Sequence, residues 1–121
     1  MHFHTHDTSG ASIASAIAMA HAGCDIIDFA TASMANNTSQ PSLNAFLAAM
    51  EGDARDPGIN YLVAEPYDAY WAKVREMYRP FECGMKSGTA RVYDHEIPGG
   101  QYSNLMVQAR ANIGGVVGFG C

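Results

Sequence analysis

The feature that most constrains the fold is the run from Cys24 to Ala30, CDIIDFA, which shows little alternation between polar and apolar residues. Strands of this kind are typical of parallel sheets covered on both faces. An alanine-rich helix is predicted before it, at about Ala11 to Ala22, and Gly23 stands where a helix C-terminal cap belongs. The extended segment Met1 to His6 precedes that helix. The order strand, helix, strand predicts an α/β fold with parallel strands.

The next segment is predicted to be a polar loop followed by a short helix. Thr31 to Gln40 is rich in Ser, Thr and Asn, which favour loops. Pro41 suits the first turn of a helix, and Leu43 to Met50 carries the apolar residues for one. Gly52 to Asn60 is rich in turn residues.

A longer helix is predicted to start at Glu65 and Pro66 and to end near Pro80 and Gly84. Its apolar residues recur three and four positions apart, which predicts a face packed into a core: Tyr70, Val74, Met77, Tyr78 and Phe81. A loop over Cys83 to Val92, a turn from His95 to Gly100 and a last helix over Gln101 to Arg110 complete the pattern.

Composition excludes several classes of protein. The 121 residues are enough for one small domain, and their formal net charge is −5 without any cluster of Lys or Arg, so nucleic acid is not an expected partner. No apolar run reaches the length of a membrane span. The three cysteines, Cys24, Cys83 and Cys121, are widely spaced, which predicts free thiols in a reducing compartment.

The strongest local motif is His4-Thr5-His6. Residues two apart in a strand face the same side, so the two imidazoles project together and suit two ligands of one divalent metal ion. His2 lies two residues before His4, so in a strand its side chain would face the same side. A catalytic metal usually has three protein ligands, and the spacing offers no obvious third. The same motif also arises by chance, and the start MHFHTH is compatible with a cloning tag.

Longer motifs help to decide between a metal site, a chance occurrence and a cloning tag. HFHTHDTSG, an alanine-rich helix, AGCDIIDFA and SMANNTSQPS follow one another, and AYWAKVREMYRPFECGMKSG and VYDHEIPGGQYSNLMVQA come later. In this order they resemble the second half of the carboxyltransferase domain of the pyruvate carboxylase family, over about His2 to Arg110. TSQPS and HEIPGGQYSNL are far more specific than His-x-His alone.

The resemblance implies a TIM-type β/α barrel, of which this chain is an incomplete C-terminal half plus the helices that follow. Such a domain transfers a carboxyl group from carboxybiotin to pyruvate and gives oxaloacetate. A zinc or manganese ion at the barrel mouth is implied, held by an aspartate and a carboxylated lysine on other strands and by the histidines that match His4 and His6. Biotin belongs to a carrier domain and ATP to a further domain, neither of which is in this chain. His2 is implied to be a barrel-interior or strand-packing residue.

The resemblance also matches Thr38 of the TSQP motif with the family's catalytic threonine, whose hydroxyl passes a proton between biotin and pyruvate. Ser39 and Gln40 either line the biotin pocket or cap the helix that begins at Pro41. For Asp7 two roles stay open, as a group that orients a histidine or as a cap toward Ser9 and Gly10.

The chain departs from the family beyond Arg110, where the glycine-rich tail ANIGGVVGFGC differs. We therefore expect residues 1–110 to be a partial carboxyltransferase domain, residues 111–121 to be a divergent tail, and the isolated chain to be inactive. The expected partners are pyruvate, carboxybiotin and the remainder of a homotetrameric carboxylase in the mitochondrial matrix or cytoplasm. The alternatives are a sister biotin-dependent carboxyltransferase, such as an oxaloacetate decarboxylase alpha subunit or a transcarboxylase, and a small non-catalytic metal-binding protein.

Overall fold

The computed structural model describes residues 1–82, 88–94, 101, 105 and 108–109. It begins with strand β1 (His2–Phe3), helix α1 (Ser12–His21) and strand β2 (Ile26–Ile27). The two strands are parallel, with His2 opposite Ile26 and Phe3 opposite Ile27, which confirms the predicted strand, helix, strand order. Both strands are shorter than predicted. Ile26 is 56% exposed, so the expectation of a strand covered on both faces is wrong here, because the described residues form a sheet of two strands.

Helix α1 ends at the glycine that the sequence suggests. Gly23 has a φ of 87°, a left-handed conformation that a residue without a Cβ adopts at little cost. Its N–H donates to the carbonyl of Ala20 at 3.0 Å, and the N–H of Cys24 donates to the carbonyl of Met19 at 3.0 Å. These bonds satisfy carbonyls that the helix itself leaves open. The predicted C-terminal cap is confirmed.

Helix α2 (Leu43–Met50) begins at a serine cap rather than at the proline. The Ser42 side chain accepts a hydrogen bond from the N–H of Ala45, and Ser42 also forms a parallel bridge with Ala30. Pro41 is fully buried and precedes this cap, so its predicted place in the first helical turn is wrong. Ser42 is the better cap because a hydroxyl oxygen can reach the free N–H groups of the first turn.

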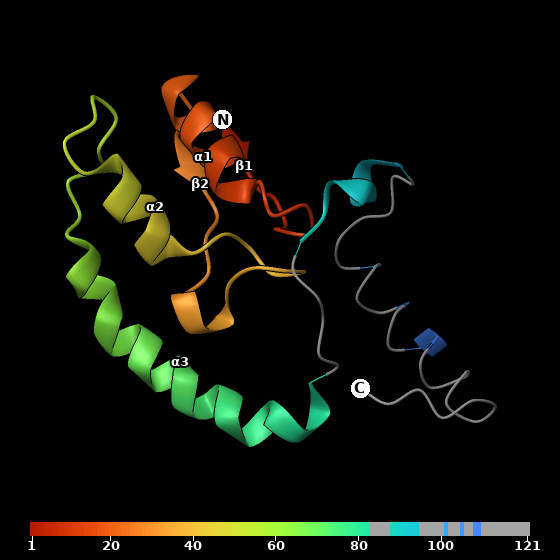
Figure 1. The fold of residues 1–121 in the computed structure, drawn as a ribbon. Coiled ribbons are helices and arrows are strands. Elements are labelled where there is room, and N and C mark those ends of the chain that lie inside the picture. The colour runs from red at the N-terminus through yellow and green to blue at the C-terminus, as the bar shows by residue number, and fades with distance from the viewer. Residues whose placement is uncertain (83–87, 95–100, 102–104, 106–107, 110–121) are drawn as a thin grey trace.

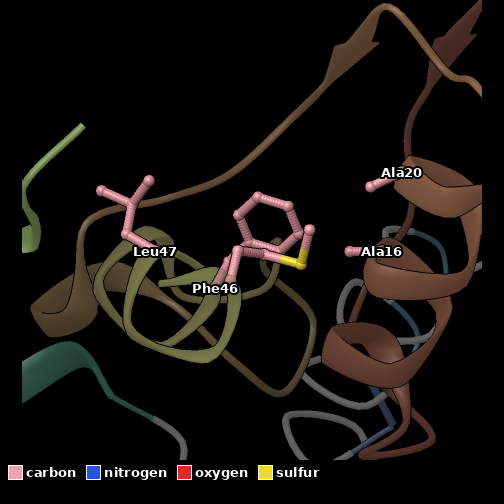
Figure 2. Close-up of a cluster of buried hydrophobic side chains, with 5 residues drawn as sticks. Ala16, Ala20, Phe46 and Leu47 are labelled. Carbon is pink, nitrogen blue, oxygen red and sulfur yellow. The ribbon is translucent and has the colours of Figure 1, made fainter. Parts of the chain in front are cut away.

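The core lies between α1 and α2. Figure 2 shows Ala16 and Ala20 of α1 facing the side of α2 that carries Phe46. Small residues on α1 let the larger side chains of α2 approach closely, and Met50 is 1% exposed. The rings of Phe29 and Phe46 are 4.4 Å apart between centroids, which joins the segment after β2 to this core.

Helix α3 (Glu65–Tyr78) runs along the side of the molecule away from the strands (Figure 1). It follows the short 3-10 helix η2 (Tyr61–Ala64) and is continued by η3 (Arg79–Phe81), so the helix ends before Pro80, as predicted. The predicted core face of α3 is wrong. Within the described part of the chain α3 packs on η1 (Ala32–Met34) and η2, and four of the five residues of the predicted face are each at least 61% exposed: Tyr70, Met77, Tyr78 and, in η3, Phe81.

The chain closes, in its described part, with the 3-10 helix η4 (Ala90–Asp94), which lies partly within a segment predicted to be a loop. The predicted turn at His95 to Gly100, the glycine-rich tail, Cys83 and Cys121 lie outside the described residues, and so does most of the predicted last helix. Cys24 is a buried free thiol, as expected. No helix in the described ranges has the length and apolar character needed to cross a bilayer.

Candidate metal centre

The two histidines of the His4-Thr5-His6 motif lie side by side directly after β1. Their ring centroids are 5.2 Å apart and the planes meet at 78°. The Nε2 atoms of His4 and His6 are 3.4 Å apart, so each ring turns the same nitrogen toward the other. The predicted same-side arrangement of the imidazoles is confirmed. It matches the expectation that residues two apart in an extended segment share a face, although strand β1 itself ends at Phe3.

The loop that carries the TSQ residues binds to this motif through its backbone. The Nδ1–H of His6 donates to the carbonyl oxygen of Thr38 at 2.5 Å. The N–H of Asp7 donates to the carbonyl of Ser39 at 2.9 Å. Two consecutive carbonyls of the loop therefore hold two consecutive residues of the motif.

A tight turn gives this loop its shape. Asn36 and Asn37 have φ values of 72° and 53°, a left-handed conformation that asparagine tolerates better than most residues. The N–H of Asn36 donates to the carbonyl of Gln40 at 2.9 Å, and the N–H of Ser39 donates to the carbonyl of Asn36 at 2.9 Å. These bonds leave the carbonyls of Thr38 and Ser39 available to the motif.

Helix α3 fixes the other end of the same loop. The N–H of Ser33 donates to the carboxylate of Asp68 at 2.5 Å, and the Ser33 hydroxyl donates to the backbone carbonyl of Asp68 at 3.2 Å. Arg75 donates to the Ser33 carbonyl at 2.6 Å. The carboxylate and the guanidinium thus bind both backbone polar groups of Ser33, which holds η1 in place.

Asp28 is the acidic residue of the site, and sequence reasoning missed it. One carboxylate oxygen lies 2.7 Å from Nδ1 of His4 and the other lies 2.8 Å from Nε2 of His2. Hydrogen bonds from His2 and then from His4 hold the pKa of Asp28 below its ordinary value. The signal was the strand register. With His2 opposite Ile26, the next residue on the same face, His4, comes opposite Asp28.

These partners determine which nitrogens of the two rings carry hydrogen in their neutral forms. A carbonyl oxygen and an ionised carboxylate can only accept, so His6 toward Thr38 and His4 toward Asp28 both carry the hydrogen on Nδ1. Each Nε2 then has a free lone pair directed toward the other ring. Two lone pairs 3.4 Å apart are favourable neighbours when a cation or a shared proton lies between them.

The geometry fits a divalent metal ion. Two bonds of about 2.1 Å, the usual zinc–imidazole length, open to about 108° when they end on nitrogens 3.4 Å apart, which is close to the tetrahedral angle. His4 and His6 could therefore hold one ion through Nε2. Within the described ranges of the chain, no group of three or more His, Cys, Asp or Glu side chains is arranged to hold a metal ion.

Asp7 and His2, the other candidates near the motif, make different contacts. Asp7 accepts hydrogen bonds from the N–H and the hydroxyl of Ser12, at 3.0 and 2.5 Å, so it caps α1, although through Ser12 rather than through Ser9 and Gly10. The carboxylate that contacts a histidine of the motif is that of Asp28. His2 is exposed and contacts Asp28, so it packs against no core in the described part of the chain, and its place in a barrel interior stays a prediction.

The TSQ residues lie beside the metal-binding candidates, but their side-chain roles stay predictions. The contact of Thr38 with His6 is made by its backbone carbonyl. Ser39 and Gln40 do not cap α2, because that position belongs to Ser42.

Known proteins resemble this chain closely over most of its length. Pyruvate carboxylase 1 of Caenorhabditis elegans is 51% identical over 111 residues, which is 90% of this chain and 9% of the relative. Pyruvate carboxylase of Bacillus subtilis is 52% identical over 110 residues, or 91% of this chain and 10% of the relative. The mitochondrial enzyme of Homo sapiens is 46% identical over 113 residues. The chain thus spans about a tenth of the length of these relatives. No protein-family model matches it.

Solved structures agree with the sequence comparison. The carboxyl transferase domain of Rhizobium etli pyruvate carboxylase, solved with pyruvate, matches with a TM-score of 0.85 and 44% identity, over 91% of this chain and 19% of that one. The same domain solved with oxamate and biotin matches equally well, over 18% of that chain. By sequence and by fold, this chain belongs to the pyruvate carboxylase family and matches a part of its carboxyltransferase domain.

Proposed function

We propose that this chain forms part of the carboxyl-transfer site of a pyruvate carboxylase, in which a carboxyl group moves from carboxybiotin to pyruvate and oxaloacetate results. The main support is the pair of Nε2 atoms of His4 and His6, 3.4 Å apart, in a segment about half identical to pyruvate carboxylases. The Rhizobium etli domain, whose structures contain pyruvate in one case and biotin in another, has the same local fold.

In this proposal His4 and His6 hold a divalent ion, zinc or manganese, through Nε2. A bound divalent ion polarises oxygen atoms of a substrate as a Lewis acid. The further ligands, an aspartate and a carboxylated lysine, come from other strands of the TIM-type barrel, of which residues 1–110 are a part. Biotin and ATP belong to other domains of the homotetrameric parent enzyme, which acts in the mitochondrial matrix or the cytoplasm. The human relative is named mitochondrial.

Two other residues of the chain fix which ring nitrogen of each imidazole carries hydrogen. Asp28 and the carbonyl of Thr38 each accept a hydrogen from Nδ1, so that both Nε2 lone pairs are free. Backbone hydrogen bonds hold the loop from Asn36 to Gln40 against the histidine motif, and we propose that Ser39 and Gln40 contact the biotin ring there. The Thr38 hydroxyl is proposed to pass the proton from the pyruvate methyl group to the biotin nitrogen.

The test is a chimera in which residues 1–110 replace the matching segment of the Bacillus subtilis relative. We expect it to form oxaloacetate from pyruvate. His4→Ala and His6→Ala should each reduce that activity by more than the roughly 10–100-fold that loss of a ligand-supporting group costs. His21→Ala is the matched control, because His21 is an exposed histidine on α1 that pairs with Asp53. ATP-dependent carboxylation of biotin should survive in all three variants.

Thr38 needs separate variants, because its backbone carbonyl and its hydroxyl have different roles. Thr38→Val keeps the carbonyl and the side-chain shape but has no hydroxyl, whereas Thr38→Ser keeps both polar groups. The proposal expects loss of oxaloacetate formation in Thr38→Val and substantial activity in Thr38→Ser. Equal activity in the two variants would remove the hydroxyl from the mechanism and leave the backbone contact with His6 as the function of this residue.

A further inference from the structure

Asp28 is bound on both sides of its carboxylate. One oxygen is 2.7 Å from Nδ1 of His4, and the other is 2.8 Å from Nε2 of His2. The backbone N–H of Asp28 also donates to the carbonyl of Phe3 at 3.1 Å. The side chain is 35% exposed, so these contacts are made at a surface open to solvent, where water would otherwise compete for the carboxylate.

The contact with His4 has a chemical consequence. A neutral imidazole in water exchanges between two forms, with the hydrogen on either ring nitrogen. An acceptor fixed next to Nδ1 selects the form in which Nε2 has the free lone pair, and only that form can use Nε2 as a ligand. Without this acceptor, His4 would have to give up its Nε2 hydrogen or turn its ring before it could bind an ion.

His2 has a different relation to the same carboxylate. His2 lies two residues before His4, and its ring contacts Oδ1 of Asp28, whereas His4 contacts Oδ2. A carboxylate held at one oxygen can rotate about its last bond, whereas one held at both keeps its plane. His2 therefore holds the Asp28 carboxylate in place without competing with His4 for the same oxygen. This accounts for a third histidine, His2, beside the two whose Nε2 atoms face each other.

We propose that Asp28, steadied by His2, is the positioning residue that holds His4 in its metal-binding form. This inference rests on the proposed function, because it assigns the role of Asp28 toward the ion that His4 and His6 are proposed to hold. It adds to the site a carboxylate and a histidine that are not themselves ligands.

The first measurement needs no metal. Nitrogen-15 NMR of the imidazole rings in the full 121-residue chain reports which nitrogen carries hydrogen. We expect His4 to be held as the Nδ1–H form in the unchanged chain and to become a mixture of both forms in Asp28→Ala. Asp25→Asn is the matched control, since Asp25 lies just before β2 and pairs with the chain's amino terminus. The control should leave the His4 signals unchanged.

The second measurement is affinity for Zn²⁺ alone, by calorimetric titration of the same chain. Asp28→Ala should weaken binding by about 10–100-fold, the usual effect of losing a group that orients a ligand. Asp28→Asn retains one carbonyl oxygen for Nδ1 of His4, so its loss should be smaller. His2→Ala should lie between Asp28→Asn and the unchanged chain, because the acceptor remains but can rotate.

The outcomes separate this inference from the function on which it rests. Zinc affinity and ring form that are both unchanged in Asp28→Ala would overturn it. Unfolding of the isosteric Asp28→Asn, seen by far-ultraviolet circular dichroism, would also overturn it, because Asp28 would then act on the fold. If Asp28→Ala alters the form of His4 but His4→Ala and His6→Ala leave oxaloacetate formation by the chimera unchanged, the positioning role stands and the proposed metal function fails.

Discussion

Asp7 follows the two histidines directly in sequence, yet its side chain caps helix α1. Its substitution therefore tests whether this residue acts on the helix or on the histidines. Its carboxylate accepts hydrogen bonds from the N–H and the hydroxyl of Ser12. Ser12 is 2% exposed, so water cannot replace the carboxylate when it is removed. Ala11 at the N-cap position has no side chain that could take over.

The expected cost of Asp7→Ala follows from these contacts. Loss of a helix cap costs about 1 kcal/mol, and a buried donor left without an acceptor costs about 1–3 kcal/mol. The free energy of unfolding should therefore fall by about 2–4 kcal/mol. Asp7→Asn should cost only a few tenths, because an amide oxygen caps almost as well as a carboxylate.

Urea unfolding of the chain, followed by far-ultraviolet circular dichroism, measures both variants. Ser12→Ala supplies the double-mutant comparison. With the Ser12 hydroxyl gone, Asp7→Ala should cost less, since one of the two hydrogen bonds is already absent. Equal stabilities of Asp7→Ala and the unchanged chain, or an Asp7→Asn variant as unstable as Asp7→Ala, would refute the capping role. Weaker zinc binding in Asp7→Asn at unchanged stability would favour the histidine-orienting role instead.

Three further predictions follow from other contacts. Gly88→Ala should lower the stability by about 1–3 kcal/mol in the same urea assay, because a Cβ there would clash with the backbone nitrogen of Gly10 and lie 2.9 Å from the carbonyl oxygen of Asp7; an unchanged midpoint would contradict this contact. Asp68→Ala should free Ser33 and increase proteolytic cleavage in the loop 31–40, with Glu76→Ala as an exposed control on the same helix. The N–H groups of Gly52 and Gly58 hold the pKa of Asp56 below its ordinary value, so this contribution to stability is present above about pH 3.9 and is lost as the pH falls through the lower folded pKa. Asp56→Asn should flatten that acid limb, and an identical pH profile would contradict the effect.

Helices could be predicted where their signals are local. The spacing of apolar residues, Gly23 at one helix end and Glu65-Pro66 at the start of another are all contained within a few turns of chain. The side-by-side arrangement of His4 and His6 was predictable for the same reason. The prediction needed only the two-residue spacing, although Asp28 and Thr38 also hold the rings in place.

Features that depend on distant partners were not predictable in this way. Asp28 becomes part of the site only through the register of β1 against β2, which no short pattern specifies. Helix η1 sits where Asp68 and Arg75 bind Ser33, more than thirty residues farther along the chain. The apolar spacing on α3 predicted a helix correctly but a buried face wrongly, because periodicity cannot say which neighbour is present.

The distances along the chain between the histidines and their acceptors carry a consequence for folding. His4 is 24 residues from Asp28, and His6 is 32 residues from Thr38. Neither ring can find its acceptor until α1 has formed and the loop after β2 has closed back onto the motif. The hydrogen on each Nδ1 is therefore a reporter of late folding. In a refolding experiment, the imidazole NMR signals of these two histidines should reach their final positions after the helical signal has already appeared.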